Sequence, residues 1–155
     1  MQNAKKIKKT KINGAKFSIG IVVADFNRDI TSALLKGALS ELKKNSVPEK
    51  NIQVVHVPGS FEIPFVCERL ASSQKYHALI ALGCIIKGET NHNVYLSNAV
   101  SFGLMHIIIQ EKIPIGFGIL TPNNLRQAKT RATGQNNKGQ EAAEAALYMA
   151  NLNLR

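Results

Sequence analysis

Apolar residues fall into four short runs that alternate with longer amphipathic segments along the chain. The runs are rich in β-branched residues and are bounded by Gly, Pro, Asn or Asp. This pattern is typical of strands that are buried on both faces of a parallel sheet. The strands are predicted at 17–24, 52–57, 78–86 and 113–120.

The segments between these runs have helical periodicity. In the first of them Leu34, Ala38 and Leu42 fall on one face, and Asp29 or Thr31 is its expected N-cap. The third is apolar on nearly every side, so we expect it to be buried on most sides. The first predicted helix spans about 31–45, and the second begins between 60 and 64 and ends near 73. The other three span 94–111, 125–132 and 140–151.

Strands that alternate with helices predict a three-layer α/β/α sandwich with a four-stranded parallel sheet in flavodoxin-like order. A chain of 155 residues is long enough for one domain with its own core. We expect a basic N-terminal arm at 1–15 and a single α/β domain at 16–155. In such sheets, ligands bind beyond the carboxyl ends of the strands.

The net charge of +10 does not alter the predicted fold class, because most of this net charge lies near the N-terminus. Six of the 20 basic residues lie in the first 16 positions, before any acidic residue, which leaves 14 basic against 10 acidic residues in the remainder. Such an arm could bind RNA weakly through charge alone. The sequence has no RNP-like aromatic motif and no zinc finger, so nucleic acid is not an expected partner.

Cys67 and Cys84 stand in apolar contexts without C-x-x-C spacing, which favours buried thiols in a reduced cytosol over a zinc site. No apolar run is long enough to span a bilayer. The sequence predicts a cytoplasmic protein with no membrane partner.

The stretch from Gly83 to Tyr95 is the strongest candidate for chemistry. A strand ends at a polar loop that contains Gly88, and a helix follows, so backbone N–H groups could bind an anion. His92 in the same loop can exchange a proton near neutral pH. Chemistry on a phosphorylated small molecule would explain both features. Alternatively, Thr90 or a neighbouring Asn caps the helix and His92 is merely solvated.

Other candidates follow the remaining strands, and each has a structural alternative. Phe26 could stack on a heteroaromatic ring or staple the next helix. Glu62 could accept hydrogen bonds from a ligand or stabilise a helix start. Phe117 could cover a ligand or fill the core, and Arg131 could bind phosphate or be a solvated charge. We interpret as structural three histidines with no acid or nucleophile nearby in sequence: His56, His77 and His106.

The chain resembles the lumazine synthase family from about 16 to 152. The resemblance rests on Pro58-Gly-Ser-Phe-Glu-Ile-Pro64 and on Gly83-Cys-Ile-Ile-Lys-Gly-Glu-Thr-Asn-His92. Shorter matches occur in the same order along the chain: Phe26-Asn27, Phe117-Gly118, Gln127-Ala128 with Arg131, and Asn137-Lys138-Gly139.

The resemblance implies a condensation of 5-amino-6-(D-ribitylamino)uracil with 3,4-dihydroxy-2-butanone 4-phosphate. The product would be 6,7-dimethyl-8-ribityllumazine, with release of phosphate and water, as the penultimate step of riboflavin biosynthesis. No metal or organic cofactor is implied.

The resemblance also implies roles for matching residues. His92 would transfer protons. The ribitylaminouracil would be bound by Phe26, Ser60, Phe61, Glu62, Cys84, Ile85, Ile86 and Phe117. The butanone phosphate would be bound by Glu89, Thr90, Arg131 and Lys138.

The family forms pentamers, in many members arranged as a 60-subunit icosahedral capsid, with active sites at subunit interfaces. The resemblance therefore implies a homo-oligomer in which Phe117 and Arg131 come from a neighbouring subunit, and an edge strand near residue 12 that joins the neighbour's sheet. Association with riboflavin synthase is a further expectation. The chain differs from the family pattern at 93–94 and at 132–136, so pentamer and capsid both stay open.

Two other functions fit the same sequence. One is a protein that binds ribityl or flavin ligands on this scaffold without turnover. The other is a basic-armed shell or RNA-binding module with a vestigial pocket, whose RNA binding would fall with salt.

Overall fold

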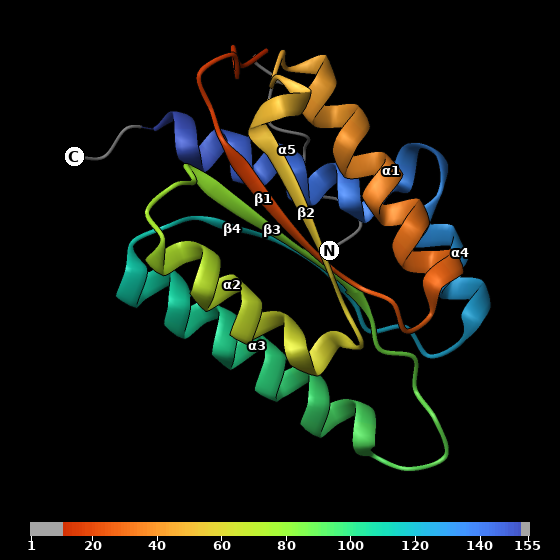
Figure 1. The fold of residues 1–155 in the computed structure, drawn as a ribbon. Coiled ribbons are helices and arrows are strands. Elements are labelled where there is room, and N and C mark those ends of the chain that lie inside the picture. Colours follow the sequence, from red (N-terminus) through yellow and green to blue (C-terminus); the bar gives the residue numbers. More distant parts are fainter. Residues whose placement is uncertain (1–10, 153–155) are drawn as a thin grey trace.

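The computed structural model describes residues 11–152, and its centre is a four-stranded parallel sheet (Figure 1). The strand order is β2-β1-β3-β4, which confirms the predicted flavodoxin-like arrangement. The strands are β1 (Ile19–Ala24), β2 (Ile52–Val57), β3 (Ala78–Cys84) and β4 (Ile115–Leu120). The order reverses between β1 and β3, so the switch point lies at the ends of these two strands.

Helices cover both faces of the sheet and complete the three layers (Figure 1). One face carries α1 (Arg28–Lys44), α4 (Leu125–Ala132) and α5 (Lys138–Asn151), and the other carries α2 (Ile63–Ser72) and α3 (His92–Glu111). Three short 3-10 helices connect these elements: η1 (Glu49–Asn51), η2 (Ser60–Glu62) and η3 (Gly134–Asn136).

The core consists of two apolar clusters, one on each face of the sheet. Side chains of β1 alternate between them: Ile21 and Val23 join the cluster under α1 and α5, whereas Val22 and Ala24 join the cluster under α2 and α3. All six residues of β1 are buried, as the uninterrupted apolar run predicted.

The predicted helix start after β1 was wrong. Helix α1 begins at Arg28, and its N-cap is Asn27, not Asp29 or Thr31. Asn27 has left-handed backbone angles (φ 59°, ψ 47°) and makes no side-chain cap bond. Its side chain instead donates to the carbonyl oxygen of Cys84 on β3, across the switch point.

The burial predicted for the third helix was also wrong within a single chain. Only Val100, Leu104 and Ile107 of α3 are buried, because this one face packs on α2 and the sheet. The opposite face leaves large apolar side chains exposed, including Phe102 at 77% and Ile109 at 70%. An apolar face of this kind is a common mark of a binding surface.

Before β1, Ile12 packs into the core, and its backbone N–H donates to the Asn45 side-chain oxygen at 3.1 Å. Residues 11–14 form no strand in this chain, and the pairing expected with a neighbour's sheet stays a prediction. The rest of the predicted arm, residues 1–10, lies outside the described residues. No helix within 11–152 is long and apolar enough to cross a membrane.

Candidate active site

A pocket of about 790 Å³ lies beyond the carboxyl ends of β1, β2 and β3. Its size is in the usual range for a small-molecule site, and it lies where doubly wound folds bind ligands. Nine of the residues predicted to contact substrate or transfer protons line it: Phe26, Ser60, Phe61, Glu62, Cys84, Ile85, Ile86, Thr90 and His92. We call this the ring pocket.

Hydrogen bonds at Phe26 and at the next residue fix the position of Phe26. Its backbone N–H donates to the carbonyl oxygen of Pro58 at 3.0 Å, and the side-chain amide of Asn27 donates to the carbonyl oxygen of Cys84 at 2.9 Å. The Phe26 ring is 70% exposed and enters no core cluster, which favours an aromatic platform over a hydrophobic staple.

The turn after β2 brings Ser60, Phe61 and Glu62 to the same pocket. Ser60 is buried, whereas Phe61 and Glu62 are exposed. A Cβ atom at Gly83 would lie 2.5 Å from the Ser60 hydroxyl, so a glycine is needed for this turn to approach β3. The carboxylate of Glu62 is thereby presented on the pocket wall.

The strand end at Cys84 offers backbone groups and no thiol chemistry. Burial raises the pKa of the Cys84 thiol to about 11, so it stays protonated and is a poor nucleophile at neutral pH. Its carbonyl already accepts from Asn27, and the N–H of Ile85 donates to Leu120 at 2.8 Å. Among the described residues, none forms a hydrogen bond with the backbone groups of Ile86 or with the carbonyl of Ile85.

The loop from Lys87 to Asn91 leads into α3. Within the described chain, no residue accepts a hydrogen bond from the backbone N–H groups of 88–91. The Thr90 hydroxyl accepts from the backbone N–H of His92 at 3.4 Å. These unpaired N–H groups at a helix start suit an anion.

His92 is the first residue of α3 and is exposed in the ring pocket. No described residue hydrogen-bonds its ring. The next side chain, Asn93, has a buried oxygen that also finds no partner in the described part of the chain. The imidazole can therefore turn toward a ligand. Residues 11–152 contain no cluster of three or more His, Cys, Asp or Glu side chains placed to hold a metal.

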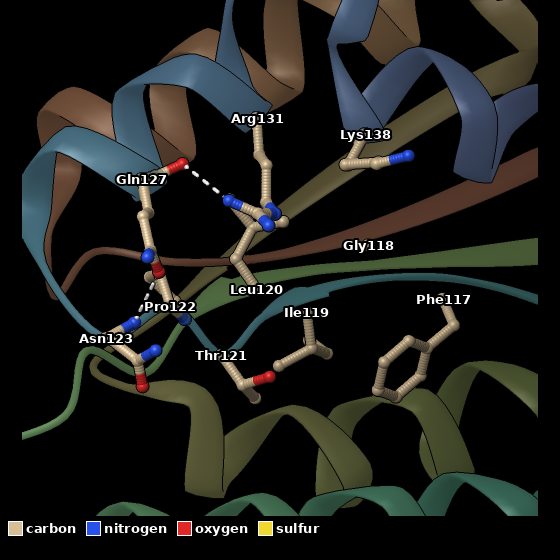
Figure 2. Close-up of a pocket in the computed structure, with 10 residues that line it drawn as sticks. All are labelled: Phe117, Gly118, Ile119, Leu120, Thr121, Pro122, Asn123, Gln127, Arg131 and Lys138. Atoms are coloured by element: carbon tan, nitrogen blue, oxygen red, sulfur yellow. Dashed lines mark hydrogen bonds between the residues drawn. The ribbon is translucent and has the colours of Figure 1, made fainter. Parts of the chain in front are cut away.

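A second pocket of about 430 Å³ lies beside the end of β4, and we call it the cation pocket (Figure 2). Arg131 comes from α4, and its Nη1 donates to the carbonyl oxygen of Gln127 at 3.3 Å. Lys138 comes from the start of α5, and its ammonium pairs with Glu141 at 2.7 Å. Phe117 also lines this pocket, but its ring lies on the opposite side of β4 from Arg131 (Figure 2).

One buried amide, whose hydrogen bonds the sequence did not reveal, connects the helices around the cation pocket. The side chain of Asn137 donates to the carbonyls of Ala33 at 2.9 Å and Ala132 at 2.6 Å. It accepts from the N–H groups of Gly139 at 2.9 Å and Gln140 at 3.2 Å. This N-cap of α5 thus ties α1, α4 and α5 together and positions Lys138.

The predicted residues therefore do not all meet in one cavity of a single chain. Phe117, Arg131 and Lys138 line only the cation pocket, and Glu89 lines neither pocket. His56 has no acid nearby in sequence, but the fold brings one to it. Its Nδ1 lies 2.9 Å from Oδ1 of Asp25, which is 31 residues earlier.

A doubly wound α/β domain with an imidazole, a carboxylate and an aromatic ring beyond its switch point has the layout of an enzyme that acts on small molecules. Sequence comparison makes the class specific. Residues 16–153 match the family model described as 6,7-dimethyl-8-ribityllumazine synthase, and the chain belongs to this family.

Two relatives with that name, from two strains of Clostridium kluyveri, are each 45% identical to this chain over 148 residues. The alignments cover 95% of this chain and 96% of each relative. The similarity therefore includes both pockets and every described element.

Proposed function

We propose that this protein condenses 5-amino-6-(D-ribitylamino)uracil with 3,4-dihydroxy-2-butanone 4-phosphate to give 6,7-dimethyl-8-ribityllumazine. Family membership supplies the reaction, and the ring pocket is the observation that carries it to these residues. The amine of the uracil forms an imine with the ketone and releases water. Loss of phosphate leaves a second carbonyl, and the nitrogen that bears the ribityl chain attacks it with release of a second water, which closes the second ring of the product.

In this proposal the ring pocket binds the uracil. Phe26 stacks on the pyrimidine ring, and Glu62 accepts from ribityl hydroxyls beside Ser60 and Phe61. The unpaired backbone groups of Ile85 and Ile86 contact the edge of the ring, with Cys84 contributing only packing. His92 moves protons during imine formation and phosphate loss, which general acid–base catalysis accelerates roughly 10²–10⁴-fold.

The phosphorylated substrate requires positive charge, and no Lys or Arg within 11–152 lines the ring pocket. The cation pocket has two, Arg131 and Lys138. We therefore infer that the site is completed between two copies of the chain, with Phe117, Arg131 and Lys138 of one copy facing the ring pocket of another. Backbone N–H groups of Glu89 and Thr90 complete the phosphate contacts.

The exposed apolar face of α3 supports such an assembly, because burial against a second copy would remove it from water. Association with riboflavin synthase stays a prediction. The two free buried thiols fit a cytoplasmic location.

The direct test is an assay with both substrates that follows lumazine formation and phosphate release together. Matched release of both products is expected. Tight binding of a ribityl ligand without turnover would favour the alternative, a binding protein on the same scaffold. If a verified oligomer neither bound the ligand nor turned over the substrates, the resemblance to the family would extend only to the fold.

The shared site has its own test, in which two inactive variants are mixed. Chains with His92→Ala and chains with Arg131→Ala each lack one function. If the two residues meet across an interface, unfolding and reassembling equal amounts together restores about one quarter of the sites. If both act within one chain, the mixture stays as inactive as its components.

A further inference from the structure

Asp25 and His56 form a polar pair at the edge of the sheet, next to the ring pocket but not in it. The distance from His56 Nδ1 to Asp25 Oδ1 is 2.9 Å, and Arg28 Nε lies 4.0 Å from the same oxygen. The two side chains are 45% and 42% exposed. Exposed pairs of this kind contribute little to stability, so a stabilising role explains the geometry poorly.

The pair lies where two strands continue beyond their regular pairing. The last regular β1–β2 partners are Ala24 and Val57. Beyond them, the backbone N–H of Asp25 donates to Val57 at 2.8 Å and that of Phe26 donates to Pro58 at 3.0 Å. The main chain is thus held against β2 up to the residue whose ring faces the pocket.

The alternation of β1 places Asp25 and Phe26 on opposite faces of the sheet. Asp25 follows Val23 on the α1 face, where the register sets His56 opposite Val23. Phe26 follows Ala24 on the α2–α3 face, where it lines the ring pocket. A bond that fixes the Asp25 side chain therefore also limits rotation of the peptide that carries Phe26.

Phe26 needs such support because its ring is held by no core contact. Asn27, on its other side, has left-handed backbone angles and is bonded to β3. We propose that Asp25 and His56 are a positioning pair, which holds the Phe26 ring at the angle that stacks on the heteroaromatic ring of the substrate. This inference rests on the proposed function, because it assigns the pair to binding of the ribitylaminouracil.

The test uses Asp25→Ala and His56→Ala in the full-length protein. Each variant should raise the KM for the ribitylaminouracil several-fold, because a ring that is not held loses part of its stacking. The KM for the butanone phosphate and the denaturant midpoint should stay unchanged. Equal increases in both KM values, or a fall in kcat alone, would overturn the positioning role.

The same substitutions in a Phe26→Ala background separate positioning from a general effect. If the pair acts through the Phe26 ring, it has nothing left to position, and the KM should not rise further. An increase by the same factor as in the wild type would contradict the proposal.

A control comes from β2, at the end opposite to the one that carries His56. Tyr76 donates a hydrogen bond to Gln53 on β2, far from the carboxyl ends. Tyr76→Phe removes a side-chain bond from β2 without touching the ring pocket, so both KM values should stay at the wild-type level. A KM increase for the ribitylaminouracil in this variant would show that any loosening of β2 has the effect, and it would overturn the specific role of the pair.

Failure of the proposed function can be told apart from failure of this inference. Calorimetric binding of 6-(D-ribitylamino)uracil, which lacks the reacting 5-amino group, needs no turnover. Binding by the wild type without catalysis would contradict the proposed enzymatic function. The effect of the Asp25–His56 pair on binding could still be measured. Binding that is equal in the wild type and Asp25→Ala would overturn the positioning pair alone.

Discussion

At the residue scale, His92 is the only imidazole lining the ring pocket, and no described side chain holds its ring. Its exposure means that its replacement removes no core contact. We expect His92→Ala to lower kcat by roughly 10²–10⁴-fold while the protein stays folded. Added imidazole should restore part of the rate. A variant with wild-type kcat would remove His92 from the mechanism.

The buried thiol of Cys67 gives a prediction for stability against pH. Burial raises its pKa from 9.0 to about 12, so it stays protonated in the folded chain while the unfolded thiol ionises above about pH 9. Its contribution to stability is therefore complete below pH 9 and is lost as pH rises toward 12. The sign follows from the unfolded state binding fewer protons.

Cys67→Ala makes this contribution measurable. Wild-type stability should fall faster than that of Cys67→Ala, by roughly 1.4 kcal/mol per pH unit above about pH 9. Denaturant unfolding between pH 8 and 10.5 measures the difference between the two proteins. Cys84 shifts in the same direction but is present in both, so it cancels. Parallel pH profiles would contradict the buried, protonated state of Cys67.

At the element scale, the contact between α5 and α1 depends on one glycine. A Cβ atom at Gly139 would lie 2.0 Å from the carbonyl oxygen of Leu34, so the two helices can approach this closely only without a side chain. The same turn positions Lys138 of the cation pocket. Gly139 is therefore needed for packing and for the site.

Gly139→Ala should force α5 away from α1. We expect a loss of about 1–3 kcal/mol in the free energy of unfolding and a higher KM for the butanone phosphate. Gly88→Ala is the control for stability, because a Cβ there would meet nothing within 4 Å. Equal unfolding midpoints for both variants would show that α5 can shift without cost.

Element types and order could be predicted from the sequence because periodicity and breakers decide them locally. Strand β2 and helix α4 have the predicted bounds, whereas β3 ends at Cys84 and not at Ile86. The predicted start of α1 was wrong because the Asn27 side chain forms a hydrogen bond with a strand that is distant in sequence. Contacts between remote residues leave no local pattern.

The same reason limits prediction of the site. Phe26, Glu62 and His92 could be grouped in advance, since the carboxyl ends of parallel strands meet at one edge. The bond between Asp25 and His56 could not, because it depends on register between strands that are 31 residues apart. The fourfold bonding of Asn137 was equally invisible in sequence.

At the scale of the whole molecule, the exposed face of α3 predicts that a lone chain is not the working form. Phe102 is its most exposed large apolar side chain, at 77%. Burying a phenylalanine stabilises an interface by about 1.5–3 kcal/mol, and a symmetric assembly repeats this at every contact.

Phe102→Glu should therefore dissociate the assembly and abolish turnover together, because the two pockets would no longer face one another. Light scattering gives the mass and the two-substrate assay gives the rate. Ser40→Glu adds the same charge at an exposed position of α1 and should change neither. Full activity in a monomeric Phe102→Glu protein would contradict the shared site.

The amide of Asn137 also has a consequence for how freely this sequence can vary. It gives two hydrogen bonds and receives two, and it does so while buried. Aspartate cannot donate, glutamine is one methylene longer, and smaller residues leave carbonyls unpaired. A saturation screen selected on growth without added riboflavin should therefore reject nearly every replacement at position 137, although this residue touches no substrate in the proposed site.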